Sequence, residues 1–338
     1  MKRNSILIIL QFSLFLIFSS RTPAQDVFEM TVAADGSADY KSIQQAIDAC
    51  KSFPDKRITI HLRNGVYHEK VVVPACNTQL SIIGESAEKT IISYGDYFDK
   101  IKRGRNSTFY TYTFLVEADD FYAENLTIEN SAGPVGQAVA LHVSGDRCAF
   151  HNCRILGNQD TLYTDGLNSR QYFAGCYIEG TTDFIFGAAT VLFDNCTICC
   201  KANSCITAAS TPQGKRYGYV FINSKVIATE GVQKAYFGRP WRDFANVVFM
   251  NCELGSHILP AGWSNWPGTS RDKTAYFAEF GNRGPGADNT HRVDWSHQLT
   301  KEQAAMYTLE KILAPSIPFE KPADQWTRGE NNIENGQK

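Results

Sequence analysis

The chain has little of what several large protein classes depend on. Its 338 residues include only ten cysteines, too few for a fold held together mainly by disulfide bridges. It has no Gly-X-Ser-X-Gly motif and no phosphate-binding glycine loop, so nothing indicates an α/β serine hydrolase or a nucleotide-binding enzyme. It also has no excess of positive charge, because the formal net charge is −2. A mildly acidic chain is a poor candidate for binding nucleic acid.

Long apolar runs are also missing, apart from one at the N-terminus. Lys2 and Arg3 precede the 13-residue stretch Ile6–Phe18, and small and polar residues follow up to Ala24. This run is too short to span a bilayer comfortably, so we expect a cleaved signal peptide over residues 1–24 rather than a membrane anchor. Its removal would take away three basic and no acidic residues, giving a net charge of −5. We therefore expect a secreted, extracellular protein that binds neither membranes nor nucleic acid.

The rest of the chain suits one large domain. Its composition is ordinary for a globular protein, with 43% hydrophobic and 20% charged residues. We place the domain at residues 25–320 and a polar C-terminal tail at 321–338. Three N-glycosylation sequons fit secretion, and they begin at Asn106, Asn125 and Asn195.

A repeat runs through the middle of the sequence. Six segments each pass from a β-rich start, through Asn or Gly at the fifth position, to an aliphatic residue. The fifth positions lie 20 to 28 residues apart. They are Asn125, Asn152, Gly175, Asn195, Asn223 and Asn251.

A repeat of this length is typical of one coil of a solenoid, because each unit is too short to bury its own apolar face. The segments are rich in β-branched and aromatic residues and lack helical spacing. Asn or Gly at a fixed point suits a bend with left-handed backbone angles. The repeat therefore favours an all-β parallel β-helix, with a β-sandwich as the alternative.

Two short helices are expected to flank the coils and close their ends. Ile43, Ala46, Ile47 and Cys50 have amphipathic helical spacing. Near the C-terminus, a capping box at residues 300–303 predicts a helix that continues through residue 313. Such elements would cover core and strand edges that terminal coils expose.

Two aspartates occupy equivalent places in adjacent repeats. Asp160 lies eight residues after Asn152, and Asp183 lies eight residues after Gly175. Stacked coils would bring the two carboxyl groups to neighbouring strands, about 4.8 Å apart. Two close carboxylates resist joint ionisation, which separates an acid from a base or nucleophile. The alternative is a solvated column of turn residues.

Other groups of polar residues carry less weight. An acidic turn lacks the spacing of an EF-hand, and a Cys/His group falls inside a repeat strand, so we expect neither to bind metal. The acidic turn contains Glu117, Asp119 and Asp120, and the Cys/His group contains Cys148, His151 and Cys153.

Four cysteines share the sixth repeat position and should form a stacked column, either bridged or as free thiols. They are Cys153, Cys176, Cys196 and Cys252.

Five motifs follow one another along the chain, at Gly65–Glu69, Gly136–Leu141, Gly157–Tyr163, Gly180–Gly187 and Gly238–Trp241. In sequence and order they resemble the motifs of plant pectin methylesterases (pectinesterases), and the likeness extends over about residues 31–315. The resemblance implies a right-handed parallel β-helix that removes methyl esters from pectin, a methylated homogalacturonan, in the cell wall. It also implies a form without the N-terminal inhibitor-like domain of many plant members, a monomer without cofactor or metal, and a proteinaceous pectinesterase inhibitor as a candidate partner.

The resemblance also implies roles for individual residues. Asp183 resembles the nucleophile, Asp160 the general acid and then base, Gln137 and Gln159 the oxyanion donors, and Arg239 the residue that orients the nucleophile. A guanidinium favours an ionised nucleophile, amide groups can donate to an oxyanion, and methoxide needs a proton to leave. The residues expected to contact substrate are Thr108, Gln137, Phe186, Arg239, Trp241 and Trp263.

Three positions depart from the family pattern. Asn158 replaces an aromatic residue, Thr182 replaces Val, and Ala38 replaces Gly. None of the five catalytic positions is altered, so we expect an active enzyme. The alternatives are a non-catalytic pectin-binding β-helix, a β-helical pectate lyase or polygalacturonase that would cleave the polymer, and hydrolysis of another acyl substrate at the same site.

Overall fold

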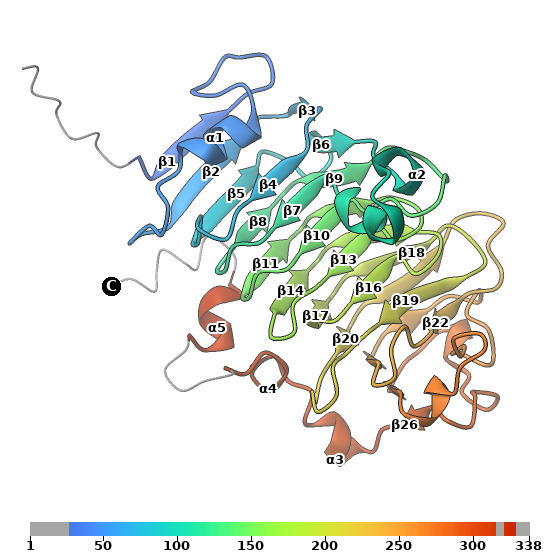
Figure 1. The fold of residues 1–338 in the computed structure, drawn as a ribbon. Helices are drawn as coiled ribbons and strands as arrows, with labels where there is room; N and C mark the ends of the chain where they lie inside the picture. Colours follow the sequence, from blue (N-terminus) through green and yellow to red (C-terminus); the bar gives the residue numbers. More distant parts are fainter. Residues whose placement is uncertain (1–26, 316–320, 329–338) are drawn as a thin grey trace, which may run out of the picture.

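The computed structural model describes residues 27–315 and 321–328, and these residues wind into a stack of coils with three parallel sheets as its walls (Figure 1). The fold is the predicted all-β, right-handed parallel β-helix with short flanking helices. The β-sandwich alternative is wrong, because the pairings between the strands of each sheet are parallel.

Each full coil adds one strand to each sheet. Sheet 1 contains β1 (Glu29–Val32), β2 (Ile58–Leu62), β5 (Leu80–Gly84), β8 (Tyr122–Glu124), β11 (Cys148–His151), β14 (Arg170–Ala174), β17 (Thr190–Asp194), β20 (Tyr219–Ile222), β23 (Asn246–Met250), β25 (Tyr276–Phe280) and β26 (His297–Gln298). Sheet 2 contains β3 (Gly65–Tyr67), β6 (Thr90–Tyr94), β9 (Thr127–Asn130), β12 (Arg154–Leu156), β15 (Tyr177–Gly180), β18 (Thr197–Cys200), β21 (Lys225–Ala228) and β24 (Glu253–Leu254). Sheet 3 contains β4 (Val71–Val73), β7 (Phe114–Val116), β10 (Leu141–Val143), β13 (Leu162–Thr164), β16 (Ile185–Gly187), β19 (Cys205–Ala209) and β22 (Tyr236–Gly238).

Short helices lie in the segments between the strands and after the last strand. The α-helices are α1 (Ile43–Ala49), α2 (Phe98–Ile101), α3 (Lys301–Ala304), α4 (Leu309–Ile312) and α5 (Ala323–Trp326), and the 3-10 helices are η1 (Gly104–Tyr110), η2 (Arg271–Lys273) and η3 (Pro285–Ala287).

The repeated Asn or Gly forms the bend between sheet 1 and sheet 2. All six predicted positions have left-handed backbone angles, with φ between 46° and 61°. Asn adopts this conformation more easily than most side chains because its amide can bond locally. In one pair of neighbouring coils, Asn152 Nδ2 donates to Asn125 Oδ1 at 2.7 Å. The bends therefore stack, and they hold successive coils in register.

Aromatic rings fill the interior of the coils. Phe221 lies between Phe193 and Phe249, with ring centroids 4.4 Å and 4.2 Å away and planes within 7° of parallel. All three side chains are fully buried. Each ring gains apolar burial and a stacking contact from the coil above and the coil below.

Replacing Phe221 by alanine is expected to lower the free energy of unfolding by about 3–5 kcal/mol, because the cavity would interrupt the stack. Urea denaturation of the wild type and the variant measures the difference. Phe53→Ala is the control, since Phe53 is 71% exposed and its loss should change stability by no more than about 0.5 kcal/mol. Equal losses in both variants would contradict the packing argument.

The predicted cysteine column is present, and its members are free thiols. Cys153, Cys176, Cys196 and Cys252 are all buried and unbridged. Ser224 occupies the same place in the coil between Cys196 and Cys252, where its hydroxyl accepts a hydrogen bond from the Cys196 backbone N–H at 3.0 Å. The column thus packs as small side chains in the core.

The N-terminal helix is confirmed, whereas the C-terminal prediction needs correction. In α1, Ile43, Ala46 and Ile47 are buried, and Ser42 caps the first turn. The capping box at Thr300 is also present, but the predicted helix to residue 313 is divided into α3 and α4. The chain leaves the helix between them, where the Tyr217 hydroxyl donates to the Met306 carbonyl at 2.7 Å. Tertiary contacts therefore override the continuous helical pattern.

The sequence predicted that the C-terminal helix would close the end of the stack. The C-terminal helices lie elsewhere in the structure. They lie along the outer face of sheet 1, where buried residues of α3, α4 and α5 join one apolar cluster with Tyr172, Leu192 and Val220 (Figure 1). The predicted polar tail therefore starts with a packed segment, because Ala323 and Trp326 are 2% and 4% exposed.

The predicted signal peptide lies outside the described residues. Within residues 27–315 and 321–328, no helix has both the length and the apolar character needed to cross a membrane.

Candidate active site

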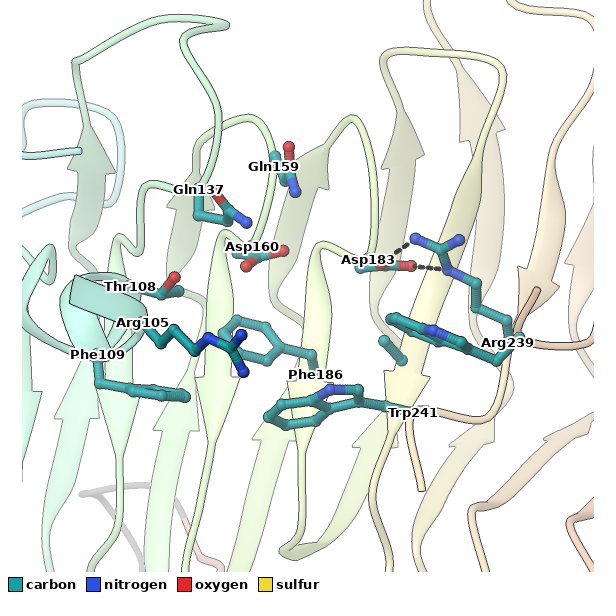
Figure 2. A pocket seen from close by; sticks show the side chains of 12 residues that line it. Arg105, Thr108, Phe109, Gln137, Gln159, Asp160, Asp183, Phe186, Arg239 and Trp241 are labelled. Carbon is teal, nitrogen blue, oxygen red and sulfur yellow. Dashed lines mark hydrogen bonds and ion pairs between the residues drawn. The ribbon is translucent and has the colours of Figure 1, made fainter. Parts of the chain in front are cut away.

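The two aspartates lie in the turns that lead from sheet 2 to sheet 3. Leu162 of β13 pairs with Ile185 of β16, so Asp160 and Asp183 stand at matching positions two residues earlier. Both have left-handed backbone angles, with φ of 63° for Asp160 and 50° for Asp183. Non-glycine residues in this conformation are uncommon, and they cluster at functional sites. The predicted register is confirmed, and both carboxyl groups face the same pocket (Figure 2).

Asp183 is held by a guanidinium. Arg239 follows β22 directly, and its Nε and Nη2 donate to the two carboxylate oxygens of Asp183 at 2.9 Å and 2.6 Å (Figure 2). Asp183 is 6% exposed. Burial raises the pKa of the Asp183 carboxyl, and the ion pair with Arg239 opposes that rise. A two-pronged contact of this kind also fixes the direction of the carboxylate.

Asp160 has no such partner among the described residues. Burial raises its pKa well above the usual range for aspartate, and the negative charge of Asp183 raises it further, while the more distant Arg239 acts in the opposite direction. Because only Asp183 is paired with a cation, Asp183 loses its proton first. The two environments therefore separate the pKa values of the pair, and this separation favours Asp183 as the ionised group and Asp160 as the protonated one.

Two side-chain amides lie beside the acid pair. Gln137 and Gln159 form a parallel bridge between adjacent coils, in which the Ala138 backbone N–H donates to the Gln159 carbonyl at 3.1 Å. Both residues line the pocket that holds the aspartates (Figure 2). Neither side-chain amide bonds to another residue in the described part of the chain. Their N–H groups are therefore available to a ligand.

These groups line a pocket of about 300 Å³ on the outer face of sheet 3. Its walls combine the polar residues with aromatic rings. Phe186 is stacked on Tyr163 at 4.6 Å and meets Trp241 edge-on at 5.8 Å. Flat apolar faces beside precisely placed polar groups are typical of ligand sites. The lining residues are Arg105, Thr108, Phe109, Gln137, Gln159, Asp160, Asp183, Phe186, Ala208, Arg239, Trp241 and Trp266.

The sequence pattern of the pectinesterase family matches residues 29–316. The chain belongs to the pectinesterase family. It is 39% identical to Pectinesterase 31 of Arabidopsis thaliana over 292 residues, which are 84% of this chain and 92% of that protein. It is also 39% identical to a probable pectinesterase/pectinesterase inhibitor 58 from the same plant, but it covers 52% of that longer protein. Several of the other curated pectinesterases are likewise matched over about half their length.

Solved structures of pectin methylesterases share the fold. The enzyme from carrot superposes with a TM-score of 0.79 at 33% identity, covering 87% of this chain and 97% of that one. PemA from Erwinia chrysanthemi gives a TM-score of 0.74 at 29% identity, covering 86% and 98%. Membership of the pectinesterase family thus agrees with the three-sheet coil.

Most residues predicted to form the pectinesterase site come together in one pocket. Gln137, Gln159, Asp160, Asp183 and Arg239 all line it. So do the three predicted substrate contacts Thr108, Phe186 and Trp241.

Trp263 was expected to contact substrate, and this expectation is wrong for the observed fold. Its side chain is 1% exposed and packs inside the coil against Phe237, Phe249 and Phe277 at 4.5–6.0 Å between ring centroids. Trp263 pairs with Gly238 at the end of sheet 3, which continues the wall of the coil and turns the ring inward. Trp266, three residues later, lines the pocket instead, with the Arg239 guanidinium 4.3 Å from its ring.

Sequence reasoning also missed Arg105 and Phe109. Both belong to η1, which lies between β6 and β7 outside the repeat. Phe109 directly follows Thr108, a predicted substrate contact, so its position in the sequence was the one indication that it could line the pocket. Asn158, which replaces an aromatic residue of the family pattern directly before Gln159, is half-buried and does not line the pocket.

The weaker candidates for metal binding have other partners. The Arg147 guanidinium pairs with Asp119, Asp120 and Asp146. Cys148 and Cys153 are fully buried in the core, and His151 Nε2 lies 2.9 Å from the Thr327 carbonyl. No group of three His, Cys, Asp or Glu residues that could hold a metal occurs in residues 27–315 and 321–328.

Proposed function

We propose that this member of the pectinesterase family hydrolyses the methyl esters of pectin, releasing methanol and leaving the galacturonate carboxylate. The observation that carries the proposal is the two-pronged contact of Arg239 with Asp183 beside the unpaired, half-buried Asp160. In the proposed reaction, Arg239 orients the Asp183 carboxylate and favours its ionised form, and Asp160 serves as the protonated acid within the same pocket. Ester hydrolysis through an acyl-enzyme needs both an ionised nucleophile and a protonated general acid.

In the first half of the reaction, an Asp183 carboxylate oxygen attacks the ester carbonyl carbon. The negative charge moves to the carbonyl oxygen, where the side-chain N–H groups of Gln137 and Gln159 stabilise it. The C–O bond to the methoxy group then breaks, and Asp160 gives its proton to the departing oxygen, so that methanol leaves. An anhydride between Asp183 and the galacturonyl group remains.

In the second half, Asp160 has become a carboxylate and can accept a proton from water. The resulting hydroxide attacks the galacturonyl carbon, and the same amides hold the oxyanion. The bond to Asp183 breaks, which restores the Asp183 carboxylate and the protonated Asp160. Every step uses side chains of this chain, and none requires a cofactor or metal.

The proposal is tested by methanol release from highly methylated pectin, with the length of the polymer followed in parallel. Methanol without shortening of the polymer is the expected result. Shortened chains would support a lyase or polygalacturonase, and pectin binding without methanol would support the non-catalytic alternative. The family match already favours ester hydrolysis over both.

Replacing Arg239 by leucine is expected to shift the acid limb of the kcat/KM profile upward by about 1–3 pH units. Asp183 would then be buried without a cation, so its pKa would rise and it would be protonated at pH values where the wild type is active. The pH dependence of kcat/KM measures the shift. Arg283→Leu is the control, because Arg283 is 65% exposed and lies outside the pocket. An unmoved acid limb would contradict the role of Arg239.

We further propose that the protein is secreted to the cell wall as a monomeric glycoprotein and meets a proteinaceous pectinesterase inhibitor there. The basic and apolar N-terminal sequence and three sequons support secretion. Asn106 and Asn195 are exposed, whereas Asn125 is half-buried and bonded to Asn152. Glycosidase treatment of the protein purified from cell-wall extract should therefore reveal glycans at Asn106 and Asn195.

A further inference from the structure

Two hollows lie at the opposite end of the sheet 3 strands from the acid pair. They are formed where the chain passes from sheet 3 into sheet 1, beside α3, α4 and the link between these helices (Figure 1). Their volumes are about 680 Å³ and 380 Å³, and they share Lys215 and Arg216. Each is larger than the pocket of the acid pair, which has about 300 Å³. The proposed reaction uses neither of them.

Positive side chains dominate the lining of these hollows. Arg170 is 4% exposed and is already paired with a neighbouring aspartate. The other lining cations are Lys215, Arg216 and Lys311. Glu310 is the only acidic residue among the described residues of the lining. Three cations beside one carboxylate form a local positive patch on a chain whose net charge is −2.

Arg216 projects from a fixed backbone. The Asn246 side-chain N–H donates to the Arg216 carbonyl at 3.0 Å, and Asn246 is 6% exposed. The neighbouring Tyr217 hydroxyl donates to the Met306 carbonyl, which ties this turn to the segment after α3. The Arg216 side chain is exposed, and its guanidinium forms no hydrogen bond or ion pair within residues 27–315 and 321–328. It is therefore available to an anionic ligand.

The two lysines are bonded to neutral groups in the described part of the chain. Lys215 Nζ donates to the Asn168 side-chain oxygen at 2.8 Å, and Lys311 Nζ donates to the Ala305 carbonyl at 3.1 Å. Such contacts orient an ammonium group without compensating its charge. Because an ammonium has three N–H donors, each lysine can also bind a carboxylate that enters the hollows.

Tyrosine rings lie beside these cations. Tyr217 lines the larger hollow, and Tyr276 and Tyr307 line the smaller one. Tyr217 and Tyr307 meet edge-on, with ring centroids 5.3 Å apart. Flat aromatic faces suit sugar rings, and the cations suit acid groups carried on those rings. The two hollows together form a basic cleft, lined by Lys215, Arg216, Tyr217, Tyr276, Tyr307 and Lys311.

We propose that the basic cleft binds a run of free galacturonate units, so that demethylated pectin is held at a site separate from the acid pair. Each unit carries one carboxylate, and a run of carboxylates matches cations that extend along two adjoining hollows. A methylated run has no charge to offer. The inference rests on the proposed function, because the ligand is the product of that reaction. A polymer in the cleft leaves the acid-pair pocket open, because the two sites lie at opposite ends of the sheet 3 strands.

The test measures binding of a fully demethylated galacturonate oligomer at low salt by isothermal titration calorimetry. Replacing Lys215 and Arg216 together by glutamine should raise Kd by about tenfold or more, because two charged contacts are lost. Binding at the acid-pair pocket is common to both proteins, so a difference between them reports on the cleft. The difference should shrink as salt is added, because salt screens exposed charges.

The matched control replaces Lys225 and Arg283 together by glutamine. Both are exposed and lie outside the cleft, and their loss changes the net charge by the same amount. This variant should change Kd by less than about twofold. Equal melting temperatures would show that both double variants fold. Equal losses of affinity in both, or no loss in either, would overturn the basic cleft.

Cross-linking tests the location of the site. A galacturonate oligomer with its carboxyl groups activated as succinimidyl esters should form amide links to Lys215 and Lys311, which mass spectrometry of the peptides detects. An excess of the unactivated oligomer should prevent these links. Links spread evenly over the exposed lysines, Lys225 included, would contradict the proposal.

Methanol release from the wild type separates this inference from the proposed function. A wild type that binds the oligomer through Lys215 and Arg216 but releases no methanol would overturn the proposed function and leave the binding site in place. A wild type that releases methanol, with a Kd that does not depend on these two residues, would overturn the basic cleft alone.

Discussion

Replacing Asp183 by asparagine is expected to lower kcat for methanol release by about 10⁴-fold or more. Asparagine keeps the size of the side chain but is a far weaker nucleophile than a carboxylate. It also removes the ion pair that both Arg239 contacts now form. Initial rates of methanol release from highly methylated pectin, measured at saturating substrate, give the comparison.

The control for this variant is Asp243→Asn. Asp243 also pairs with an arginine, Arg271, at 3.2 Å, but it is 66% exposed and lies outside the pocket. Its replacement should leave kcat within about twofold of the wild type, as is usual for surface changes. If Asp183→Asn stayed folded and kept most of its activity, Asp183 would not be the nucleophile.

Replacing Asp160 by asparagine is expected to lower kcat by about 10²–10⁴-fold, because the departing methoxy group would lose its proton donor. The pH profile should change as well. In the wild type, activity rises as Asp183 loses its proton and falls at higher pH as Asp160 loses its own. The variant should lack the alkaline limb. A retained alkaline limb would show that another group is the acid.

Thermal unfolding of the same variant provides its control. The pKa of Asp160 is raised in the folded state above its ordinary value of 3.8. The wild type therefore loses stability as pH rises from that ordinary value towards the raised one, because folding then opposes ionisation. Asparagine stays neutral, so Asp160→Asn should be more stable than the wild type at pH 7 and similar near pH 3. A less stable variant at pH 7 would attribute lost activity to unfolding.

The sequence contained enough information for the fold and for the centre of the site. The fifth repeat position predicted the left-handed bends, because Asn and Gly tolerate backbone angles that other residues avoid. Once the coils are stacked, a spacing of eight residues places Asp160 and Asp183 on neighbouring turns. Register in a solenoid follows from the repeat alone, so residues inside the repeat could be positioned without a structure.

Residues outside the repeat could not be positioned in this way. Trp263 and Trp266 are three residues apart, and only the pairing of Trp263 with Gly238 shows which ring enters the core. Arg105 lies in η1, which has no counterpart in the other coils. The break between α3 and α4 depends on a contact with Tyr217, which is distant in sequence. Each of these features depends on long-range contacts that no local pattern encodes.

The most direct test of the central claim is to trap the acyl group on Asp183. The enzyme would turn over methylated pectin in hydroxylamine, which attacks anhydrides, and its peptides would then be analysed by mass spectrometry. We expect a hydroxamate on the peptide that contains Asp183, dependent on pectin and absent from Asp183→Asn. Each turnover exposes the anhydride again, so the modification should accumulate and inactivate the enzyme. Hydroxylamine can also attack the galacturonyl carbon of the anhydride, which leaves a hydroxamate on the polymer and regenerates Asp183. Sustained methanol release with no enzyme-dependent hydroxamate on either Asp183 or the polymer would contradict the two-aspartate account.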